Sequence, residues 1–417
     1  MKNILIIPPF NPYPLVSGGH QAIFNGIAIL KDVANVYMIT PVTESQYKRK
    51  EHNAILAELP FVHVIPFILP GSKHNLTWYW KVFKNKLKKY APKLKASLEN
   101  SIPNVETSSS FRINDWIGDT YGEEIRLVQK TIKTYHIDIV QCEMIPTLTL
   151  CDCIPNSVKK IFVHHELRYV RNELLLKQHQ EASKELLDEV RTDRENEIRY
   201  LNKYDEIITL SEVDTQKLRE VGVTVPICTS FAVVRDLPQL HPALPSQKRI
   251  VFIGPEFHAP NREGVMWFLK HCWNDILSYD SSYQFDIIGK WSDETALMLA
   301  NTYQRVTCLG FVDDLHSAMD GATMIVPILV GSGIRMKILE SAQWGVPIVT
   351  TSVGAEGLPL ENEKHVYLAD TPEQFVKAII AFEDNDKRRV CTQAILTDIL
   401  PKYSLSALKT NRLNSYQ

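Results

Sequence analysis

Short apolar runs recur along the chain, and longer amphipathic segments lie between most of them. Continuous apolar runs separated by helices are typical of parallel β-sheets that helices cover on both faces. We therefore expect an α/β protein with two doubly wound, Rossmann-like domains that face each other across a cleft. The strands are predicted in two sets: residues 3–7, 35–40, 61–68, 137–141, 160–164 and 206–210, then residues 249–254, 284–289, 306–310, 322–327, 347–351 and 365–368.

A proline-rich segment separates the two sets of strands. Residues 234–248 read VRDLPQLHPALPSQK and contain three prolines. We expect an N-terminal, acceptor-side domain over residues 1–235, a linker over 236–248 and a C-terminal, nucleotide-binding domain over 249–400. Residues 401–417 are expected to form a tail or helix that crosses back to the N-terminal domain.

Composition narrows the class of protein. The net charge of −2 over 417 residues argues against nucleic acid as a partner. No run of about 18 apolar residues is present, and the first apolar run is too short for a signal peptide, so we expect a cytoplasmic protein. Residues 73–95 contain eight lysines, interleaved aromatics and no acidic residue. This stretch can rest on the inner face of an anionic membrane, or form a solvated helix whose aromatics face the core.

One stretch in the second half suggests an anion site. Residues 330–347 read VGSGIRMKILESAQWGVP, and their spacing predicts a helix that begins near Arg335. The first turn of a helix has unpaired N–H groups and a partial positive charge. Gly331 and Gly333 lack Cβ atoms and would let a ligand approach this backbone, while Arg335 and Lys337 add full charges. The stretch therefore suits a diphosphate.

Glu340 lies one turn further along the same predicted helix. A carboxylate is poorly suited to phosphate but can accept hydrogen bonds from two neighbouring hydroxyls, as on a ribose. Together the residues suit a nucleotide diphosphate; the alternative is an ordinary loop with its cations on a solvated face. The chain contains no P-loop string, and GSGIRM fails the Rossmann fingerprint because Met336 occupies the position of the third glycine.

Other polar residues follow predicted strands in the first half. His164, His165 and Glu166 stand at the end of the run KKIFV, where they can line the cleft and do acid–base work, or simply satisfy a loop. We place His164, Glu166 and Arg168 on the acceptor side. Gly18 and Gly19 precede a predicted helix and form either a turn or part of the cleft wall. The pair at 313–314 reads as a turn or helix cap, and we expect no required metal.

Taken in order, several segments resemble glycosyltransferase family 4, a retaining group with the GT-B fold, and its subgroup with a GSGxRxKxLE donor motif. The C-terminal segments are IVFIGPEFHAPNREGVMWF (250–268), QFDIIGK (284–290), VTCLGFVDDL (306–315) and MIVPILVGSGIRMKILESAQWGVPIVTTSVGAEGL (324–358). The N-terminal half agrees less tightly, through PPFNPYPLVSGGHQAIFNGIAIL (8–30) and EIRYLNKYDEIITLSEVDTQKL (197–218).

The resemblance implies a hexosyltransferase. It would move a sugar from a UDP- or GDP-sugar to a saccharide or lipid-linked acceptor, with retention and without a further cofactor, in envelope polysaccharide biosynthesis. By the same resemblance, Glu340 would bind the ribose and His165 the donor sugar. The other residues that we place on the donor side are Gly18, Gly19, Gly254, Asn261, Val312, Ser332, Gly333, Ile334, Arg335 and Lys337.

Two departures from the family pattern affect these expectations. Ser332 stands where the family often has a glutamate that contacts the donor sugar, and Pro255 and Glu256 stand where it often has an arginine and a lysine that hold the phosphates. We expect Arg335 and Lys337 to supply the missing charge. Retention without an evident nucleophile fits a front-face route, in which the protein positions the reactants and stabilises the departing diphosphate.

Two other functions fit parts of the pattern. A nucleotide-sugar 2-epimerase has a similar architecture but needs carboxylates around the sugar, and Ser332 replaces the most obvious one; it would convert its substrate without an acceptor. A non-catalytic sugar-nucleotide-binding protein would bind without turnover. The presence of Gly333, Lys337 and Glu340 favours an enzyme over this last alternative.

Overall fold

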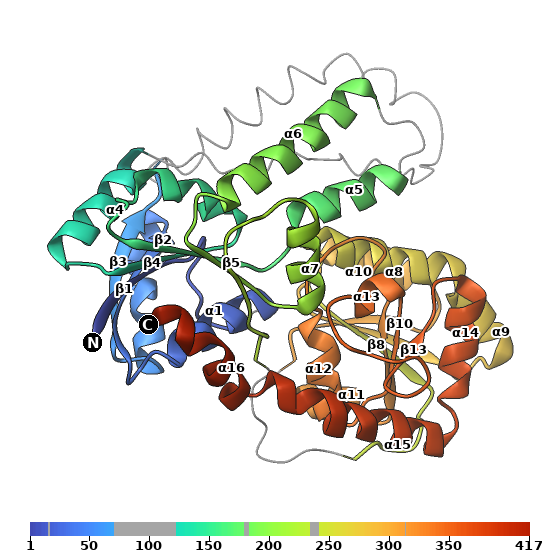
Figure 1. Cartoon of the computed structure of the whole chain (residues 1–417). Helices are drawn as coiled ribbons and strands as arrows, with labels where there is room; N and C mark the ends of the chain where they lie inside the picture. Colours follow the sequence, from blue (N-terminus) through green and yellow to red (C-terminus); the bar gives the residue numbers. More distant parts are fainter. Residues whose placement is uncertain (16, 71–121, 179–182, 234–241, 313) are drawn as a thin grey trace.

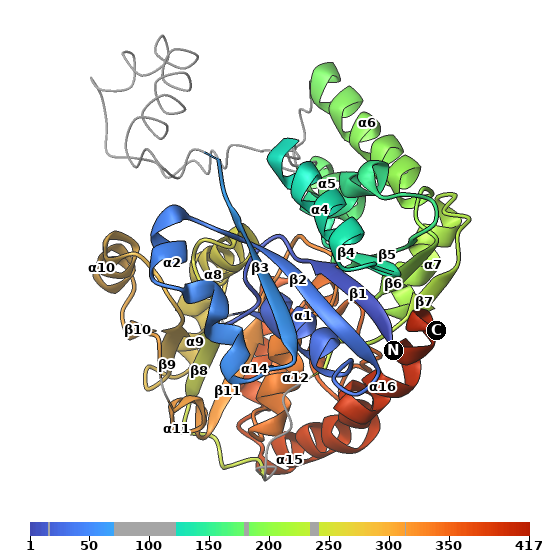
Figure 2. The same cartoon turned by 90° about the vertical axis from the view of Figure 1, so that its left-hand side faces the viewer.

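The computed structural model describes residues 1–15, 17–70, 122–178, 183–233, 242–312 and 314–417. This part of the chain forms two parallel sheets flanked by helices, as Figure 1 and Figure 2 show from two directions. The basic stretch 73–95 lies outside the described residues, and so does part of the predicted linker 236–248. A membrane contact through residues 73–95 therefore stays a prediction.

The N-terminal sheet has seven strands in its described part, in the order β3-β2-β1-β4-β5-β6-β7, and all neighbours are parallel. Its strands are β1 (Lys2–Ile7), β2 (Ala34–Val42), β3 (Val62–Ile68), β4 (Ile139–Glu143), β5 (Lys159–His164), β6 (Glu206–Thr209) and β7 (Ile227–Thr229). Its helices are α1 (Gly18–Ala28), α2 (Glu44–Lys48), η1 (Glu51–Ala57), α4 (Gly122–Thr134), η2 (Ile145–Cys153), α5 (Arg168–Gln178), α6 (Lys184–Leu201) and α7 (Glu212–Glu220).

The C-terminal sheet has six parallel strands in the described residues, in the order β10-β9-β8-β11-β12-β13. They are β8 (Arg249–Ile253), β9 (Gln284–Ile288), β10 (Val306–Gly310), β11 (Ala322–Val326), β12 (Ile348–Thr350) and β13 (Tyr367–Leu368). The helices are α8 (Ala259–His271), α9 (Trp273–Tyr279), α10 (Asp293–Thr302), α11 (Leu315–Met319), α12 (Met336–Gln343), α13 (Ser352–Ala355), α14 (Pro372–Ala381), α15 (Asn385–Ala394), η3 (Ile395–Ile399), η4 (Leu400–Tyr403), α16 (Leu405–Arg412) and η5 (Leu413–Tyr416).

The predicted α/β architecture with two Rossmann-like sheets is confirmed, and each predicted apolar run contains a strand. Strand β7 lies outside the predicted set. It has only three residues, Ile227–Thr229, and all three are half-buried at the sheet edge, so its sequence carries no continuous buried run. The cap prediction at 313–314 is met by Asp314, which caps α11 and accepts a hydrogen bond from the Ser317 N–H at 3.2 Å.

Each sheet has one point at which the strand order changes direction. This point lies between β1 and β4 in the N-terminal sheet and between β8 and β11 in the C-terminal sheet. Loops that leave the carboxyl ends of two such strands run in opposite directions and open a crevice, where open α/β sheets bind their ligands. The topology therefore predicts a ligand site at the loops after these four strands.

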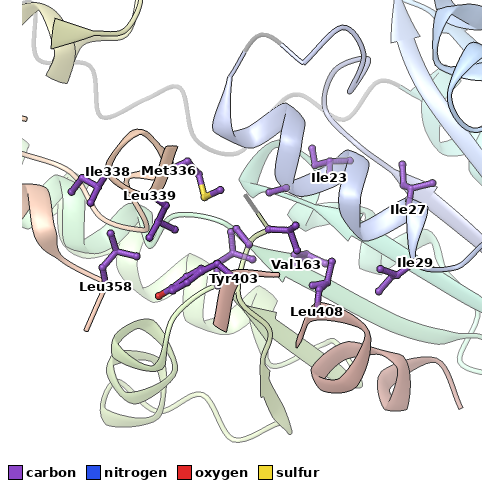
Figure 3. Packing of buried hydrophobic residues seen from close by; sticks show 14 of the residues in the cluster. Ile23, Ile27, Ile29, Val163, Met336, Ile338, Leu339, Leu358, Tyr403 and Leu408 are labelled. Atoms are coloured by element: carbon purple, nitrogen blue, oxygen red, sulfur yellow. The ribbon is translucent and has the colours of Figure 1, made fainter. Parts of the chain in front are cut away.

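A buried apolar cluster extends through both domains (Figure 3). It contains Ile23 and Ile27 of α1 together with Met336 and Leu339 of α12, and Figure 3 shows the α12 side chains at the left and the α1 side chains at the right. Burial of a side chain of this size contributes about 1.5–3 kcal/mol to the free energy of folding. This shared core joins α1 of the N-terminal domain to α12 of the C-terminal domain.

The C-terminal segment packs against the N-terminal sheet, and the two chain ends lie near each other in Figure 1. Lys2 Nζ donates to the carbonyl oxygen of Gln417. Lys159 Nζ donates to the Ser415 carbonyl oxygen at 2.7 Å, and Ser415 Oγ donates to Glu206 Oε1 at 2.5 Å. The last turns of the chain thus contact the first, fifth and sixth strands of the N-terminal sheet.

Candidate functional site

The centre of the candidate site is the loop after β11 together with the start of α12. The helix begins at Met336, and Arg335 occupies its N-cap position, in agreement with the predicted start. Ile338, Leu339 and Ala342 are buried and anchor the helix in the core. Because the helix end is held in this way, its first N–H groups form a fixed patch of partial positive charge.

Arg335 lies folded over its own loop. One guanidinium nitrogen, Nη1, donates to the carbonyl oxygens of Ser332 at 2.6 Å and of Gly333 at 2.8 Å. Burial lowers the pKa of Arg335, and the carboxylates of Glu166 and Glu356 act in the opposite direction. These bonds hold the Arg335 charge beside the first turn of α12.

Lys337 connects α12 to α8. Its Nζ donates to Asn261 Oδ1 at 3.0 Å and lies 4.3 Å from the centre of the Phe252 ring. Gly254 makes room for this pair, since a Cβ atom there would lie 2.5 Å from Asn261 Nδ2. Asn261 is fixed in turn, because its Nδ2 donates to the Pro255 carbonyl oxygen at 3.0 Å.

The Lys337 ammonium is held in a poorly solvated position. Burial, reinforced by the nearby charge of Arg335, lowers the pKa of Lys337 to about 7, while Glu340 opposes this shift. A lysine that has lost its water without gaining a carboxylate contact is stabilised in its charged form by any anion placed beside it. Lys337 therefore favours an anionic ligand at this site.

Glu340 faces the N-terminal domain. Gln21 of α1 donates from Nε2 to Glu340 Oε1 at 2.7 Å, across the domain boundary. Burial raises the pKa of Glu340, and this hydrogen bond partly offsets the effect. Gln21 Oε1 is itself buried and has no hydrogen-bond partner in the described part of the chain. An acceptor pair of this kind, Glu340 Oε2 and Gln21 Oε1, suits a ligand that carries hydroxyl groups.

Gly333 and Gly18 lie where the two domains approach each other. Gly333 has φ +80°, and a Cβ atom there would lie 2.5 Å from the His165 carbonyl oxygen. At Gly18, a Cβ atom would lie 2.9 Å from Met336 Cγ. The space that these glycines leave is filled by the other domain in this structure, so they allow the two domains to approach each other at the site.

The two adjacent histidines after β5 point to different partners. His165 Nε2 lies 2.6 Å from Glu143 Oε2, at the end of β4. His164 Nε2 lies 2.9 Å from Glu197 Oε1 of α6, and its side chain is 0% exposed. In this structure His164 therefore does not reach the cleft, because the alternation of side chains along β5 turns it into the N-terminal core.

The remaining predicted residues lie around this centre. Ser332 is 4% exposed and donates from Oγ to the Leu167 carbonyl oxygen at 3.0 Å, which ties the donor loop to the loop after β5. Arg168 starts α5, and its N–H donates to Glu197 Oε1 at 3.3 Å. The other predicted residues are Gly19 in the first turn of α1, Glu166 before α5, Val312 after β10 and Ile334 beside Gly357.

A groove of about 700 Å³ opens between the domains, next to this centre. Its N-terminal wall is formed by α5 and α7, and its C-terminal wall by the segment that starts at α13. Gly357 joins the groove to the donor loop, since a Cβ atom there would lie 3.4 Å from Ile334 Cγ1. The lining includes apolar residues such as Leu174 and Leu358, and the cations Lys177 and Arg194.

The described residues contain no group of three or more His, Cys, Asp or Glu side chains placed to hold a metal ion. None of their helices combines the length and the apolar character needed to span a bilayer.

A family model matches part of the C-terminal half. Residues 247–385 match the model of the family described as "Glycosyl transferases group 1". These residues include Asn261, Arg335, Lys337 and Glu340. A protein of Klebsiella pneumoniae, named "Uncharacterized 44.6 kDa protein in cps region", is 23% identical over 145 residues, which cover 33% of this chain and 37% of that protein.

Solved structures match over the whole length. TarM of S. aureus has a TM-score of 0.69 at 14% identity, with 100% of this chain and 99% of that chain covered. Sucrose-phosphate synthase of Thermosynechococcus elongatus has a TM-score of 0.68 at 14% identity, with 100% and 98% covered. The chain has the GT-B fold. HepE of Anabaena, solved in complex with UDP, has a TM-score of 0.61 at 11% identity, with 100% and 99% covered.

Sequence reasoning missed Gln21 and Glu143. Gln21 follows the double glycine by two residues, which places it on the first turn of α1 and in reach of Glu340. Glu143 ends a strand next to the change in strand order, and a polar residue after a buried run at such a point is a signal that could have been used.

Proposed function

We propose that this protein is a retaining glycosyltransferase that moves a hexose from a UDP- or GDP-sugar to a saccharide or lipid-linked acceptor. The observation that carries the proposal is the cluster at α12, where a helix N-terminus, Arg335 and Lys337 stand one turn from Glu340. The family match of residues 247–385 supports it, because the match contains this cluster.

The geometry suits the diphosphate at the helix end. Arg335 is held at the first turn by two loop carbonyl oxygens, so its charge needs no reorganisation when the ligand arrives. The Lys337 Nζ is held by Asn261 of α8. During transfer, negative charge grows on the leaving diphosphate, and both cations stabilise it more in the transition state than in the ground state.

Glu340 and Gln21 suit the ribose. The carboxylate would accept a hydrogen bond from one ribose hydroxyl and the free Gln21 Oε1 one from the other. UDP is the more direct expectation for the nucleotide, since the solved structures of HepE and of a TarM mutant both contain UDP. Those two proteins support the donor class only through their shared fold.

The acceptor would enter through the interdomain groove. This groove borders the donor loop at Gly357 and is large enough for a sugar unit, at about 700 Å³. The Klebsiella relative, named for its cps region, supports an acceptor in surface polysaccharide biosynthesis. We further propose a cytoplasmic protein, with residues 73–95 as the part that would meet a membrane surface.

We propose a front-face transfer at this site. The diphosphate leaves while the acceptor hydroxyl attacks from the same face, so the leaving phosphate takes the hydroxyl proton. In this scheme the chain supplies position and charge rather than a nucleophile. The new glycosidic bond forms as the bond to phosphate breaks, and the anomeric configuration is kept.

The test combines binding with turnover. Isothermal titration of the full chain with UDP, GDP and ADP should show binding of one uridine or guanosine diphosphate. Incubation with the matching nucleotide sugar and an oligosaccharide acceptor should then release the diphosphate, and NMR of the product should show the donor's anomeric configuration. Inversion would contradict the retaining assignment. Conversion of the nucleotide sugar without an acceptor would indicate the epimerase, which the family match does not favour.

A further inference from the structure

The C-terminal tail and the candidate site are connected by buried polar contacts. His165 Nε2 lies 2.6 Å from Glu143 Oε2, and the Glu143 side chain is 1% exposed. The other Glu143 oxygen, Oε1, accepts a hydrogen bond from Gln141 Nε2 and lies 3.6 Å from Arg412 Nη2. The Arg412 side chain is 2% exposed, so this glutamate has an opposite charge beside it in the core.

The tail supplies a second residue to the same network. Tyr416 donates from its hydroxyl to Gln141 Oε1 at 2.5 Å and accepts a hydrogen bond from Arg412 Nε at 2.9 Å. Gly26 of α1 leaves space for the guanidinium, since a Cβ atom there would lie 2.8 Å from Arg412 Nη1. Arg412 and Tyr416 thus enter the N-terminal core from the far end of the chain.

We propose that Glu143 is a positioning residue for His165, and that Arg412 and Tyr416 hold Glu143 in place as a carboxylate. The proposal rests on the proposed function for the role of His165, but its structural part does not. A carboxylate can only accept a hydrogen bond, so the short contact requires a proton on His165 Nε2. The neutral imidazole is then confined to one tautomer, with Nδ1 as its acceptor.

This tautomer leaves Nδ1 for the ligand. In the described residues, Nδ1 of His165 has no hydrogen-bond partner, and the side chain is 9% exposed. The His165 carbonyl oxygen faces Gly333, since a Cβ atom at Gly333 would lie 2.5 Å from it, so the His165 backbone lies against the donor loop. An unprotonated Nδ1 accepts a hydrogen bond from a hydroxyl of the transferred sugar and orients it toward the diphosphate.

The adjacent pair, His164 and Glu197, is a matched control. It has the same chemistry, a His Nε2–Glu contact of 2.9 Å, on the same strand end. Its ring is fully buried, and Glu197 also accepts the N–H of Tyr169 at 2.9 Å, so it fixes the start of α5. Loss of this pair should affect the fold, whereas loss of the Glu143 contact should affect the ring that meets the ligand.

NMR of the histidine ring nitrogens measures the tautomer of His165 directly. The full chain is labelled with ¹⁵N-histidine, and a long-range ¹H–¹⁵N spectrum at pH 8.5 is recorded for the wild type, Glu143→Gln, Tyr416→Phe and Glu197→Gln, with His165→Gln to assign the signal. The wild type should show a protonated Nε2 and an unprotonated Nδ1 at His165. Glu143→Gln should mix the tautomers, Tyr416→Phe should do so to a smaller extent, and Glu197→Gln should leave the His165 signal unchanged.

Kinetics provide a second readout. With a nucleotide-sugar donor, Glu143→Gln should lower kcat about tenfold, as expected for one misplaced hydrogen bond, with the donor KM within about twofold. Glu197→Gln should lower Tm and keep kcat per folded molecule within about twofold. A wild-type His165 protonated on Nδ1, or an unchanged spectrum and kcat in Glu143→Gln, would overturn the proposal. Absence of nucleotide binding in the wild type would overturn the proposed function instead, while the spectrum would still decide the tautomer.

Discussion

The side-chain amine of Lys337 should take up a proton when the diphosphate binds. Burial lowers the pKa of Lys337 to about 7, against the usual 10.5. At pH 8 a group with a pKa of 7 is about 10% protonated, and a phosphate contact would return its pKa to about 10. Binding of UDP should therefore draw about 0.9 protons per site from the buffer.

Titration calorimetry in two buffers of different ionisation enthalpy measures this number. The apparent binding enthalpies of the wild type at pH 8 should differ by about 0.9 times the difference between the two buffers. In Lys337→Met the difference should vanish, and the affinity should fall by roughly 30-fold to 1,000-fold for the loss of a preorganised charge worth about 2–4 kcal/mol. The same proton uptake in Lys337→Met would refute the assignment.

The same residue should also affect stability, and the sign follows from the direction of its pKa shift. The folded pKa of Lys337 lies below its unfolded value, so the unfolded chain binds more protons between about pH 7 and 10.5. The free energy of unfolding should therefore rise with pH in this window through this group. Below pH 7 the charged lysine costs up to about 5 kcal/mol, at 1.36 kcal/mol per pKa unit. Lys337→Met should thus be the more stable protein at pH 6 in denaturant unfolding.

Three further substitutions separate binding from folding. Glu340→Gln should weaken UDP binding by about tenfold in calorimetry, because one charge-assisted hydrogen bond to the ribose is weakened. The control Glu373→Gln, at an exposed position, should bind UDP as the wild type does. Gly333→Ala should lower Tm and activity together, since its Cβ would lie 2.5 Å from the His165 carbonyl oxygen at φ +80°; a wild-type Tm would show that the loop can move away. Arg388→Met should destabilise the fold by about 3 kcal/mol or more, because the buried guanidinium donates hydrogen bonds to oxygens of Leu244, Thr323 and Ala322. The protein that remains folded should bind UDP with unchanged affinity.

The fold was predictable because its signal is local. A parallel strand buried on both faces is a continuous apolar run, and β1 and β11 have such runs in the sequence. Strand β7 was not predictable for the same reason, since its three residues pair with β6 at the sheet edge and are only half-buried. Its position depends on the neighbouring strand rather than on its own sequence.

The candidate site was predictable in part. The helix start near Arg335, the cations and Glu340 follow from helical spacing within one segment. The contacts of Gln21 with Glu340 and of Arg412 with Glu143 join residues hundreds of positions apart, and no periodicity within one segment can reveal them. His164 was expected on the acceptor side because it ends the same apolar run that precedes His165, but its side chain turns into the N-terminal core and contacts Glu197.

The nucleotide should bind at the N-terminus of α12, and a crystal structure with UDP would show whether it does. A crystal structure of the full chain with UDP should show the diphosphate on the first turn of α12, between Arg335 and Lys337, with the ribose hydroxyls on Glu340. A UDP molecule bound anywhere else, with the N-terminus of α12 unoccupied, would contradict the account.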